Sequence, residues 1–272
     1  IKQAIIPLAG LGTRLLPLTS VFAKELLPIN GKPGLEYILD ECIEAGIKEI
    51  IFIISKKKMM IKKYFYNDKF YKDIIKKKGD PKIIKEYKKI LKYKKMIKFV
   101  FQDKPLGTGD AVLKTKKFIK DKYFLMLLPD DLIIRQNCSK SMIAIHKKFN
   151  SSVMASMKIN KKNVSRWGIY DVKEKINNKN FIIKGVVEKP DIKLAPSTNA
   201  VIGRYILPKT IMHNLKKLKP GYGREIHITD AINESIKNGE NFYASIFKGR
   251  YLDCGTLSGY INSGIQISKG KK

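Results

Sequence analysis

Short apolar runs that alternate with helical patterns constrain the fold of this chain more than any other feature of its sequence. In the first half, runs of strand length occur at Gln3–Leu8, Glu49–Ser55, Ile97–Gln102 and Tyr123–Leu128. Amphipathic helical patterns lie between or after them, at Gly34–Ala45, Gly109–Phe118 and Ser139–Phe149. Because parallel strands are joined by crossover helices, this order is typical of βαβ units. It predicts an α/β fold with a mostly parallel sheet, in which the strongly apolar run 123–128 is central.

The second half continues with strands and helices and offers no linker at which the chain would divide. Strands are predicted at Ser152–Met157, Gly168–Val172, Ile182–Glu188 and Val201–Leu207, then near Phe242–Phe247 and at Arg250–Asp253. Helices are predicted at Lys209–Leu215, at Ile228–Asn238 and after Thr256. We therefore interpret residues 1–272 as a single domain.

Composition excludes several classes of protein. Hydrophobic residues make up 44% of the 272 positions and aromatic residues 10%, which excludes disordered, collagen-like and coiled-coil chains. No apolar run approaches the roughly 18 residues of a membrane span, and the opening residues do not form a signal peptide. The cysteines Cys42, Cys138 and Cys254 lie far apart. An odd, sparse cysteine count predicts a reducing cytoplasm.

The net charge of +31 first suggests a nucleic-acid partner. However, 49 of the 55 basic residues are lysines, whereas surfaces that read bases and clamp phosphates favour arginine. Lysine is densest over Lys56–Lys98, where 18 of 43 residues are lysine against four acids. Tyrosine, phenylalanine and isoleucine recur there at helical spacing, which favours a solvated helical insertion with an aromatic inner stripe over a nucleic-acid arm.

A glycine-rich turn, Leu8–Pro17, follows the first predicted strand. Its glycines let the backbone turn sharply and bring N–H groups close to a ligand, and Arg14 and Lys24 follow. Cations at the carboxyl end of a buried strand indicate phosphate binding. The turn is neither a Walker A loop nor a dinucleotide fingerprint, because Leu15 stands where the third glycine would be. An ordinary βα turn is the alternative.

A second loop, Gln102–Ala111, follows the third predicted strand. Gly107 and Gly109 again permit a close approach of the backbone, and the Gln102 amide can both donate and accept hydrogen bonds, which suits a pyrimidine edge. The alternative is a capped helix start with Thr108 at the N-cap.

Acidic residues end two of the predicted strands. Asp130 lies in Leu127–Asp131 and Asp253 in Tyr251–Gly255, and carboxylates beside substrate phosphates suit a hard cation such as Mg²⁺. Asp130 could also belong to a simple strand-ending turn. No histidine stands near Cys254 in the sequence, so we interpret that cysteine as a packed residue rather than a nucleophile.

The segment Val186–Pro190 places a charged pair at the end of an apolar strand. Lys189 is suited to neutralise a phosphate and Glu188 to accept hydrogen bonds from sugar hydroxyls, with an edge ion pair as the alternative. Because a residue before proline favours extended conformations, Pro190 predicts an extended backbone at Lys189. The three histidines have neither the spacing of metal ligands nor the partners of a catalytic triad; they are His146, His213 and His227.

Taken together, these segments resemble the sugar-1-phosphate nucleotidyltransferases, in the order found in that family. The resemblance rests on Leu8–Pro17, Ala23–Pro28, Gly107–Val112, Leu128–Asp130, Val187–Pro190, Gly203–Tyr205 and Asp253–Gly255. Within the family, the sequence is most similar to the bacterial UTP–glucose-1-phosphate uridylyltransferases, on the strength of Ala9–Arg14, Glu41–Gly46 and Gly223–Ala231. The resemblance spans nearly the whole chain except the insertion 56–98.

The resemblance implies a Rossmann-like mixed sheet flanked by helices. Residues 1–135 would form a nucleotide-binding half that carries the insertion 56–98, and residues 136–272 a sugar-binding half with the C-terminal helix. It implies Mg²⁺-assisted in-line transfer of a uridylyl group from UTP to glucose 1-phosphate, which yields UDP-glucose and pyrophosphate. It also implies a cytoplasmic homo-oligomer, either a dimer or a tetramer, that binds neither nucleic acid nor membrane.

The resemblance also assigns roles by matching position. The nucleotide would meet Ala9, Gly10, Leu11, Gly12, Thr13, Gln102 and Gly107, of which Gln102 and Gly107 read the uracil. The catalytic cations would be Arg14 and Lys24 on the triphosphate and Lys189 on the sugar phosphate. Asp130 and Asp253 would bind the metal, and Gly168 and Glu188 the glucose.

Two positions depart from the family pattern. Asp110 stands where related sequences often carry histidine, and Ala23 where they often carry proline. Neither position is expected to touch the reacting atoms. Three other functions stay open at this point: thymidylyl transfer from dTTP or another sugar-1-phosphate nucleotidyl transfer, a basic nucleic-acid-binding protein, and an inactive sugar-nucleotide sensor. A sensor would have little reason to retain both Asp130 and Asp253.

Overall fold

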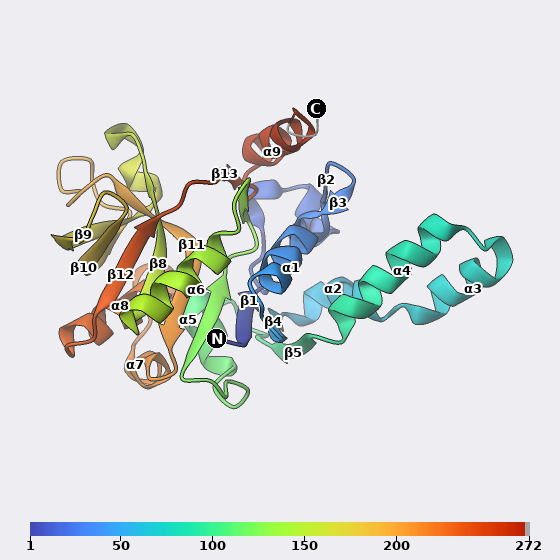
Figure 1. Ribbon diagram of the computed structural model, residues 1–272, viewed down its shortest axis with the longest axis horizontal. Helices are drawn as coiled ribbons and strands as arrows, with labels where there is room; N and C mark the ends of the chain where they lie inside the picture. The colour runs from blue at the N-terminus through green and yellow to red at the C-terminus, as the bar shows by residue number, and fades with distance from the viewer. Residues whose placement is uncertain (270–272) are drawn as a thin grey trace.

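The computed structural model, which describes residues 1–269, is built on a nine-stranded mixed sheet (Figure 1). In spatial order, the strands are β5 (Ile97–Phe101), β4 (Glu49–Ile54), β1 (Gln3–Pro7), β6 (Tyr123–Leu127), β11 (Asn199–Pro208), β8 (Ser152–Lys158), β12 (Phe242–Ile246), β10 (Asn180–Glu188) and β9 (Gly168–Lys175). The predicted α/β fold with a mixed sheet is confirmed. Every strand of this sheet coincides with a predicted apolar run, and only the ends differ by a few residues.

The parallel pairings are concentrated at one side of the sheet. Strands β5, β4, β1 and β6 are parallel neighbours, whereas β11 pairs antiparallel with both β6 and β8. Strands β10 and β9 are antiparallel as well, and β12 and β8 are parallel. The carboxyl ends of β1, β5 and β6 therefore meet at one edge, where an open α/β sheet binds its ligands.

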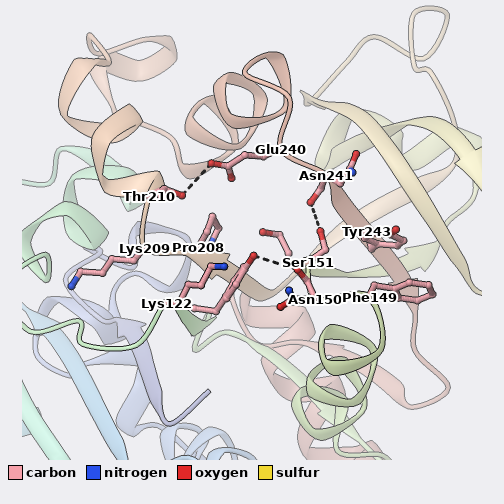
Figure 2. Close-up of a pocket in the computed structure, with 12 residues that line it drawn as sticks. Lys122, Phe149, Asn150, Ser151, Pro208, Lys209, Thr210, Glu240, Asn241 and Tyr243 are labelled. Atoms are coloured by element: carbon pink, nitrogen blue, oxygen red, sulfur yellow. Dashed lines mark hydrogen bonds between the residues drawn. The ribbon is translucent and has the colours of Figure 1, made fainter.

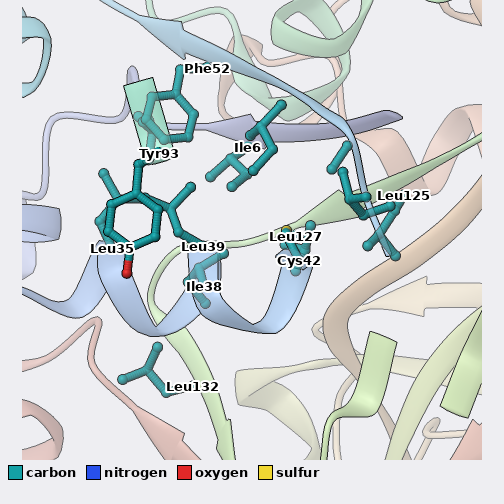
Figure 3. Packing of buried hydrophobic residues seen from close by; sticks show 14 of the residues in the cluster. Ile6, Leu35, Ile38, Leu39, Cys42, Phe52, Tyr93, Leu125, Leu127 and Leu132 are labelled. Atoms are coloured by element: carbon teal, nitrogen blue, oxygen red, sulfur yellow. The ribbon is translucent and has the colours of Figure 1, made fainter. Parts of the chain in front are cut away.

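Helices cover both faces of the sheet. Successive residues of β1 enter opposite core layers, so Ile6 packs with α1 (Gly34–Glu44) and α6 (Cys138–Phe149), while Ile5 faces the other layer. Figure 3 shows Ile6 among Leu35, Leu39 and Phe52. The second layer receives α5 (Gly107–Lys114), α7 (Ile211–Lys217) and α8 (Ile228–Lys237). No helix within residues 1–269 has both the length and the apolar content needed to cross a membrane.

The lysine-rich segment forms an arm of three helices that projects from the sheet edge beside β4 and β5 (Figure 1). The arm consists of α2 (Met59–Tyr66), α3 (Asp68–Lys78) and α4 (Pro81–Lys94). Its inner face is aromatic, as predicted: Phe65 and Tyr93 are buried against the main core, and the rings of Tyr71 and Tyr87 stack 5.0 Å apart. No residue of α3 is fully buried, so most of its lysines face solvent.

The start of the helix α5 and one short strand differ from what the sequence predicted. The helix α5 begins at Gly107 with Leu106 as its N-cap, not at Gly109 with Thr108 as the cap. Thr108 instead accepts a hydrogen bond from the backbone N–H of Ile228, at 3.3 Å, so a tertiary contact takes its hydroxyl away from helix capping. The short strand β7 (Asp131–Ile134) was not predicted; it pairs antiparallel with β13 (Arg250–Asp253), far along the chain.

A fully buried arginine joins the helices to the edge of the sheet. Arg204, in β11, forms a forked ion pair with Glu41 of α1, with N–O distances of 2.8–3.1 Å. Its remaining N–H groups donate to the carbonyls of Leu128, Gly203 and Asp131. Glu41 also accepts from the backbone N–H and hydroxyl of Ser139, at the start of α6. Arg204 thus fixes the loop that carries Asp130.

We expect Arg204→Met to lower the free energy of unfolding by about 3–5 kcal/mol, because the carboxylate of Glu41 is left buried without its charge partner. Urea unfolding monitored by circular dichroism measures the change. The exposed Arg250 provides a matched control, and Arg250→Met should shift the free energy by less than about 0.5 kcal/mol. Equal losses in the two variants would contradict a structural role specific to Arg204.

Candidate active site

Two adjoining cavities open at the edge where β1, β5 and β6 end. One, of about 590 Å³, is lined by the glycine-rich turn after β1 and by Gln102; the other, of about 620 Å³, is lined by Gly168, Glu188 and Lys189. They share Thr13, Leu128, Asp130 and Glu225 in their walls. A ligand that spans both cavities therefore passes Asp130.

The first cavity collects every residue predicted to meet the nucleotide. These residues are Ala9, Gly10, Leu11, Gly12, Thr13, Gln102 and Gly107, and Lys24 joins them. Gly107 has a φ of +93°, and a Cβ there would lie 2.6 Å from the carbonyl oxygen of Ile226. Only glycine fits that position, because both its backbone conformation and the nearby segment at Ile226 exclude a side chain.

The Gln102 amide is held within this cavity by two hydrogen bonds. Its Nε2 donates to the carbonyl of Gly107 at 3.1 Å and to Oδ2 of Asp110 at 2.7 Å. Gln102 and Asp110 are both buried. The partnership with Asp110 was not predicted from the sequence, although the two residues stand only eight positions apart in the motif that was singled out.

Lys24 and Arg14 converge on Asp130. The Nζ of Lys24 lies 2.6 Å from Oδ2 of Asp130, and Nη2 of Arg14 lies 3.4 Å from the same oxygen. Burial opposes ionisation of Asp130, but the charge and hydrogen bond of Lys24 outweigh it and hold the pKa of the carboxyl below its usual value. Burial lowers the pKa of Lys24, and the charge of Asp130 overcomes this, so the pKa is raised. Both groups are therefore charged at neutral pH.

Asp253 is brought close to Asp130 by the pairing of β7 with β13, in which Asp253 is the register partner of Asp131. The backbone N–H of Cys254 donates to the carbonyl of Asp130 at 2.8 Å and fixes the two segments together. A Cβ built on Gly255 would lie 2.7 Å from Nη2 of Arg14, 2.9 Å from Oδ2 of Asp130 and 3.2 Å from Oδ1 of Asp253. Asp130 and Asp253 thus both approach Gly255, whose backbone N–H donates to Oδ1 of Asp253 at 2.8 Å.

The donor set at this point suits Mg²⁺. Mg²⁺ binds through one or two carboxylates together with substrate phosphates and water, rather than in an all-protein cage. Among residues 1–269, no cluster of three or more histidine, cysteine or acidic side chains is placed to hold a metal ion. Asp130 and Asp253 both line the second cavity, so their carboxylates are candidate ligands for such an ion.

Asp131 is a buried neighbour whose role the sequence did not reveal. Its carboxylate accepts hydrogen bonds from the Tyr251 hydroxyl and from the Gly203 N–H, both at 2.7 Å. Burial and the charge of Asp130 raise the pKa of Asp131 to about 6. Since both of its oxygens accept from the protein, Asp131 supports the wall of the second cavity rather than reaching into it.

The second cavity is built where β9 and β10 pair. Gly168 and Glu188 are register partners, and a Cβ on Gly168 would lie 3.2 Å from Oε2 of Glu188. The absence of a side chain at Gly168 therefore leaves room for the Glu188 carboxylate. Glu188 and Lys189 line the cavity from the end of β10, as the position of their motif predicted.

The prediction of an extended backbone at Lys189 is wrong. Its φ is +44°, in the left-handed region, and its N–H donates to the carbonyl of Trp167 at 3.0 Å. Pro190 disfavours the right-handed helical region, and this cross-strand hydrogen bond selects the left-handed conformation instead of an extended one. A non-glycine residue held there stores local strain, which is a feature of functional sites.

The first residues of the lysine-rich range also border the site. Lys58 is buried, and its Nζ donates to both carboxylate oxygens of Glu25, at 2.7 and 2.8 Å, next to Lys24. Burial lowers the pKa of Lys58, and the charge of Glu25 partly offsets this. The backbone N–H of Ala23 contacts the sulfur of Met60 at 3.0 Å. The arm is thus tied at its base to the loop that carries Lys24, a contact that the composition of the segment did not predict.

A third cavity lies at the other end of the strands, where β6, β8 and β12 begin (Figure 2). Its volume is about 690 Å³, and the rings of Phe149 and Tyr243 stack 4.5 Å apart in its wall. Among the described residues that line it, Glu240 is the single carboxylate, and it accepts a hydrogen bond from Thr210 at 3.1 Å. No predicted site residue lies here, so this larger cavity is not the candidate active site.

Among residues 1–269, no cysteine or histidine lines either of the two cavities that meet at Asp130. The three cysteines are buried free thiols, and burial raises the pKa of Cys254 to about 12. A thiol in that state is a packed residue and not a nucleophile. His146 uses Nδ1 to contact the carbonyl of Ser151 at 2.7 Å, well away from Asp130.

Comparison with known proteins agrees with this geometry. Residues 3–269 match the Nucleotidyl transferase family. The chain is 36% identical over 269 residues to UTP–glucose-1-phosphate uridylyltransferase 1 of Staphylococcus saprophyticus, covering 98% of this chain and 93% of that protein. It is 34% identical over 273 residues to UTP–glucose-1-phosphate uridylyltransferase 2 of Streptococcus pyogenes, covering 98% of this chain and 90% of that protein.

Solved structures show the same fold. A UDP-glucose pyrophosphorylase complexed with UDP-glucose superposes with a TM-score of 0.88, at 33% identity, and covers 99% of each chain. The UTP-bound UDP-glucose pyrophosphorylase of Acinetobacter baumannii also gives a TM-score of 0.88, at 31% identity, over 98% of this chain and 93% of that one. These similarities extend over the entire candidate site.

We expect Lys58→Met to lower the free energy of unfolding by about 3–5 kcal/mol, because Glu25 would keep a buried charge without a partner. Urea unfolding measures the loss. Lys57→Met, at the exposed neighbouring position, is the control and should change stability by less than about 0.5 kcal/mol. The double variant Glu25→Leu, Lys58→Met should regain most of the loss; failure to regain it would show that packing, not charge, is what Lys58 contributes.

Proposed function

We propose that this chain, which belongs to the nucleotidyl transferase family, transfers the uridylyl group of UTP to glucose 1-phosphate and releases pyrophosphate. The observation that carries the proposal is the position of Asp130 in the wall shared by the two cavities, with Lys24 and Asp253 beside it. One cavity has the size and glycine-rich lining for a nucleotide, and the other carries the carboxylate and lysine that suit a sugar phosphate. The reacting phosphates would meet at Asp130.

The reaction needs no protein nucleophile. A phosphate oxygen of glucose 1-phosphate attacks the α-phosphorus of UTP, and pyrophosphate leaves from the opposite side. Two anionic substrates must approach each other, so positioning and electrostatic stabilisation provide most of the rate enhancement. We propose that Lys24 and Arg14 hold the triphosphate and then the departing pyrophosphate, while Lys189 holds the attacking phosphate.

The nucleotide and the sugar would be bound by the groups that line each cavity. We propose that the backbone of Ala9–Thr13 meets the uridine and that Gln102 and Gly107 read the uracil. In the second cavity, the Glu188 carboxylate would accept hydrogen bonds from glucose hydroxyls, and Gly168 would let the sugar approach the strand. These roles are supported by the clustering of all the named residues around one site.

We propose Mg²⁺ as the metal, held by Asp130 and Asp253. When bound, the ion would neutralise charge that develops on the phosphate oxygens. Lys24, which pairs with Asp130 in this structure, would turn its ammonium to the triphosphate as substrates arrive. The protein thus keeps the carboxylate neutralised both with and without its ligands.

We further propose a cytoplasmic homo-oligomer. Three free, buried cysteines suit a reducing compartment.

The proposed oligomer is supported by the C-terminal helix α9 (Leu257–Lys269). This helix exposes Leu257, Ile261 and Ile265 at four-residue spacing, and such an apolar stripe suits a second copy of the chain. Equilibrium sedimentation at several protein concentrations measures this association.

Pyrophosphate release over a panel of substrates tests the proposed function. UTP, dTTP, CTP and ATP are each supplied with glucose 1-phosphate, galactose 1-phosphate or mannose 1-phosphate, in the presence of Mg²⁺. The proposal expects the highest kcat/KM for UTP with glucose 1-phosphate. A preference for dTTP would instead identify thymidylyl transfer, and the absence of release with every pair would reject nucleotidyl transfer by this chain.

We expect Asp130→Asn to lower kcat by about a thousandfold while the protein stays folded, because the substitution keeps the shape of the side chain but removes its charge. Turnover is measured at saturating substrates over a range of Mg²⁺ concentrations. Asp73→Asn, at an exposed position of α3, controls for loss of a surface charge and should leave kcat unchanged. Near-normal turnover of Asp130→Asn with the same Mg²⁺ requirement would remove Asp130 from the mechanism.

We expect Lys189→Ala to lower kcat/KM for glucose 1-phosphate by about a hundredfold, or roughly 3 kcal/mol, with little change in UTP affinity. The reason is that Lys189 lines the second cavity and not the cavity proposed for the nucleotide. Kinetics at saturating UTP and calorimetry of UTP binding separate the two effects. Lys184→Ala, at an exposed position of the same strand, is the control. An equal loss for both substrates would place Lys189 on the triphosphate.

A further inference from the structure

Asp110 is a buried carboxylate with no role in the reaction as described so far. It lies in the first turn of α5, with 6% of its surface exposed, and its Oδ2 accepts a hydrogen bond from Nε2 of Gln102 at 2.7 Å. Its Oδ1 lies 3.6 Å from Nζ of Lys114, one turn further along the helix. The positive end of the helix and this lysine both stabilise a negative charge at Asp110.

The two partners of the Gln102 amide dictate which way the amide faces. The Gly107 carbonyl and the Asp110 carboxylate can only accept hydrogen bonds, so both require the NH₂ group of Gln102. A flipped amide would place Oε1 against two acceptors and would lose both bonds. The chemistry of the two partners therefore determines the orientation of the amide.

Because both amide hydrogens are committed, Oε1 is the group that Gln102 can offer to a base. An acceptor at this place pairs with the N3–H of uracil or thymine and faces repulsion from the N3 lone pair of cytosine. We infer that Asp110 is a specificity-determining positioning residue, which selects nucleotides with an imide N–H by fixing the Gln102 amide. This inference rests on the proposed function, because it assumes that Gln102 reads the base.

The alternative is that Asp110 only stabilises the start of α5. An acid in the first turn of a helix interacts favourably with the helix dipole whatever it touches. A purely structural role would change the stability of the protein and would weaken all nucleotides alike. A role in orienting Gln102 would change the ratio between UTP and CTP, so the ratio separates the two explanations.

The test compares the dissociation constants of UTP and CTP by calorimetry, alongside kcat/KM for each nucleotide with glucose 1-phosphate. In Asp110→Leu, the Gln102 amide can turn its NH₂ to the N3 atom of cytosine, so we expect the preference for UTP over CTP to fall about tenfold or more. Asp110→Asn keeps an acceptor oxygen and should retain most of the preference. The preference for UTP over dTTP should stay unchanged, because both bases carry the same N3–H.

Two further variants keep the inference falsifiable. Lys114→Met removes the second contact of Asp110 and leaves the Gln102 bond, so it should preserve the preference for UTP. In Gln102→Leu, adding Asp110→Leu should not lower the preference further, because the group that Asp110 orients is gone. An unchanged UTP-to-CTP ratio in Asp110→Leu, in a protein whose wild type releases pyrophosphate from UTP, would overturn the inference. A wild type that releases none would instead reject the proposed function.

Discussion

The buried fork between Arg204 and Glu41 is the interaction on which the active-site edge of the sheet depends. The two residues stand 163 positions apart, and their contact joins β11 to α1, to the start of α6 and to the loop 128–131. A buried ion pair is a weak source of stability, because desolvation opposes it, but it tolerates few alternative arrangements. Here every partner is hydrogen-bonded, so the pair specifies one position for the backbone that carries Asp130.

We propose that the charged groups of the site exchange partners when substrates bind. Without substrate, Lys24 and Arg14 neutralise Asp130, and the pKa values of Lys24 and Asp130 are shifted so that both groups stay ionised. Substrate phosphates would then pair with Lys24 and Arg14, and a divalent ion would bind the carboxylate of Asp130. Under the proposed function the same few groups would serve both states, so that the charges needed for electrostatic catalysis would already be in place before substrates bind.

The sequence predicted the parts of the site that lie at strand ends. Asp130 and Gln102 directly follow β6 and β5, and parallel strands bring such positions to one edge, so local patterns were sufficient. Contacts between distant segments could not be predicted in this way. The pairing of β7 with β13, the Arg204–Glu41 fork and the burial of Lys58 against Glu25 all depend on tertiary packing. The backbone of Lys189 was predicted wrongly, because a cross-strand hydrogen bond overrode the preference that Pro190 imposes.

In the lysine-rich arm, the composition does not determine which lysines form ion pairs with the core. Eighteen lysines and four acids give residues 56–98 a net charge of +14, out of +31 for the whole chain. The few lysines that face inward meet acids of the core: Lys58 pairs with Glu25, and Lys89 pairs with Glu36 at 2.7 Å. The hydroxyl of Tyr93 donates to Asp40 at 2.6 Å. An acidic edge of the core therefore fixes the base of a basic arm, and the lysines of α3 face solvent. Composition alone predicts a solvated face, whereas the acids in the first 41 residues determine which lysines become part of the structure.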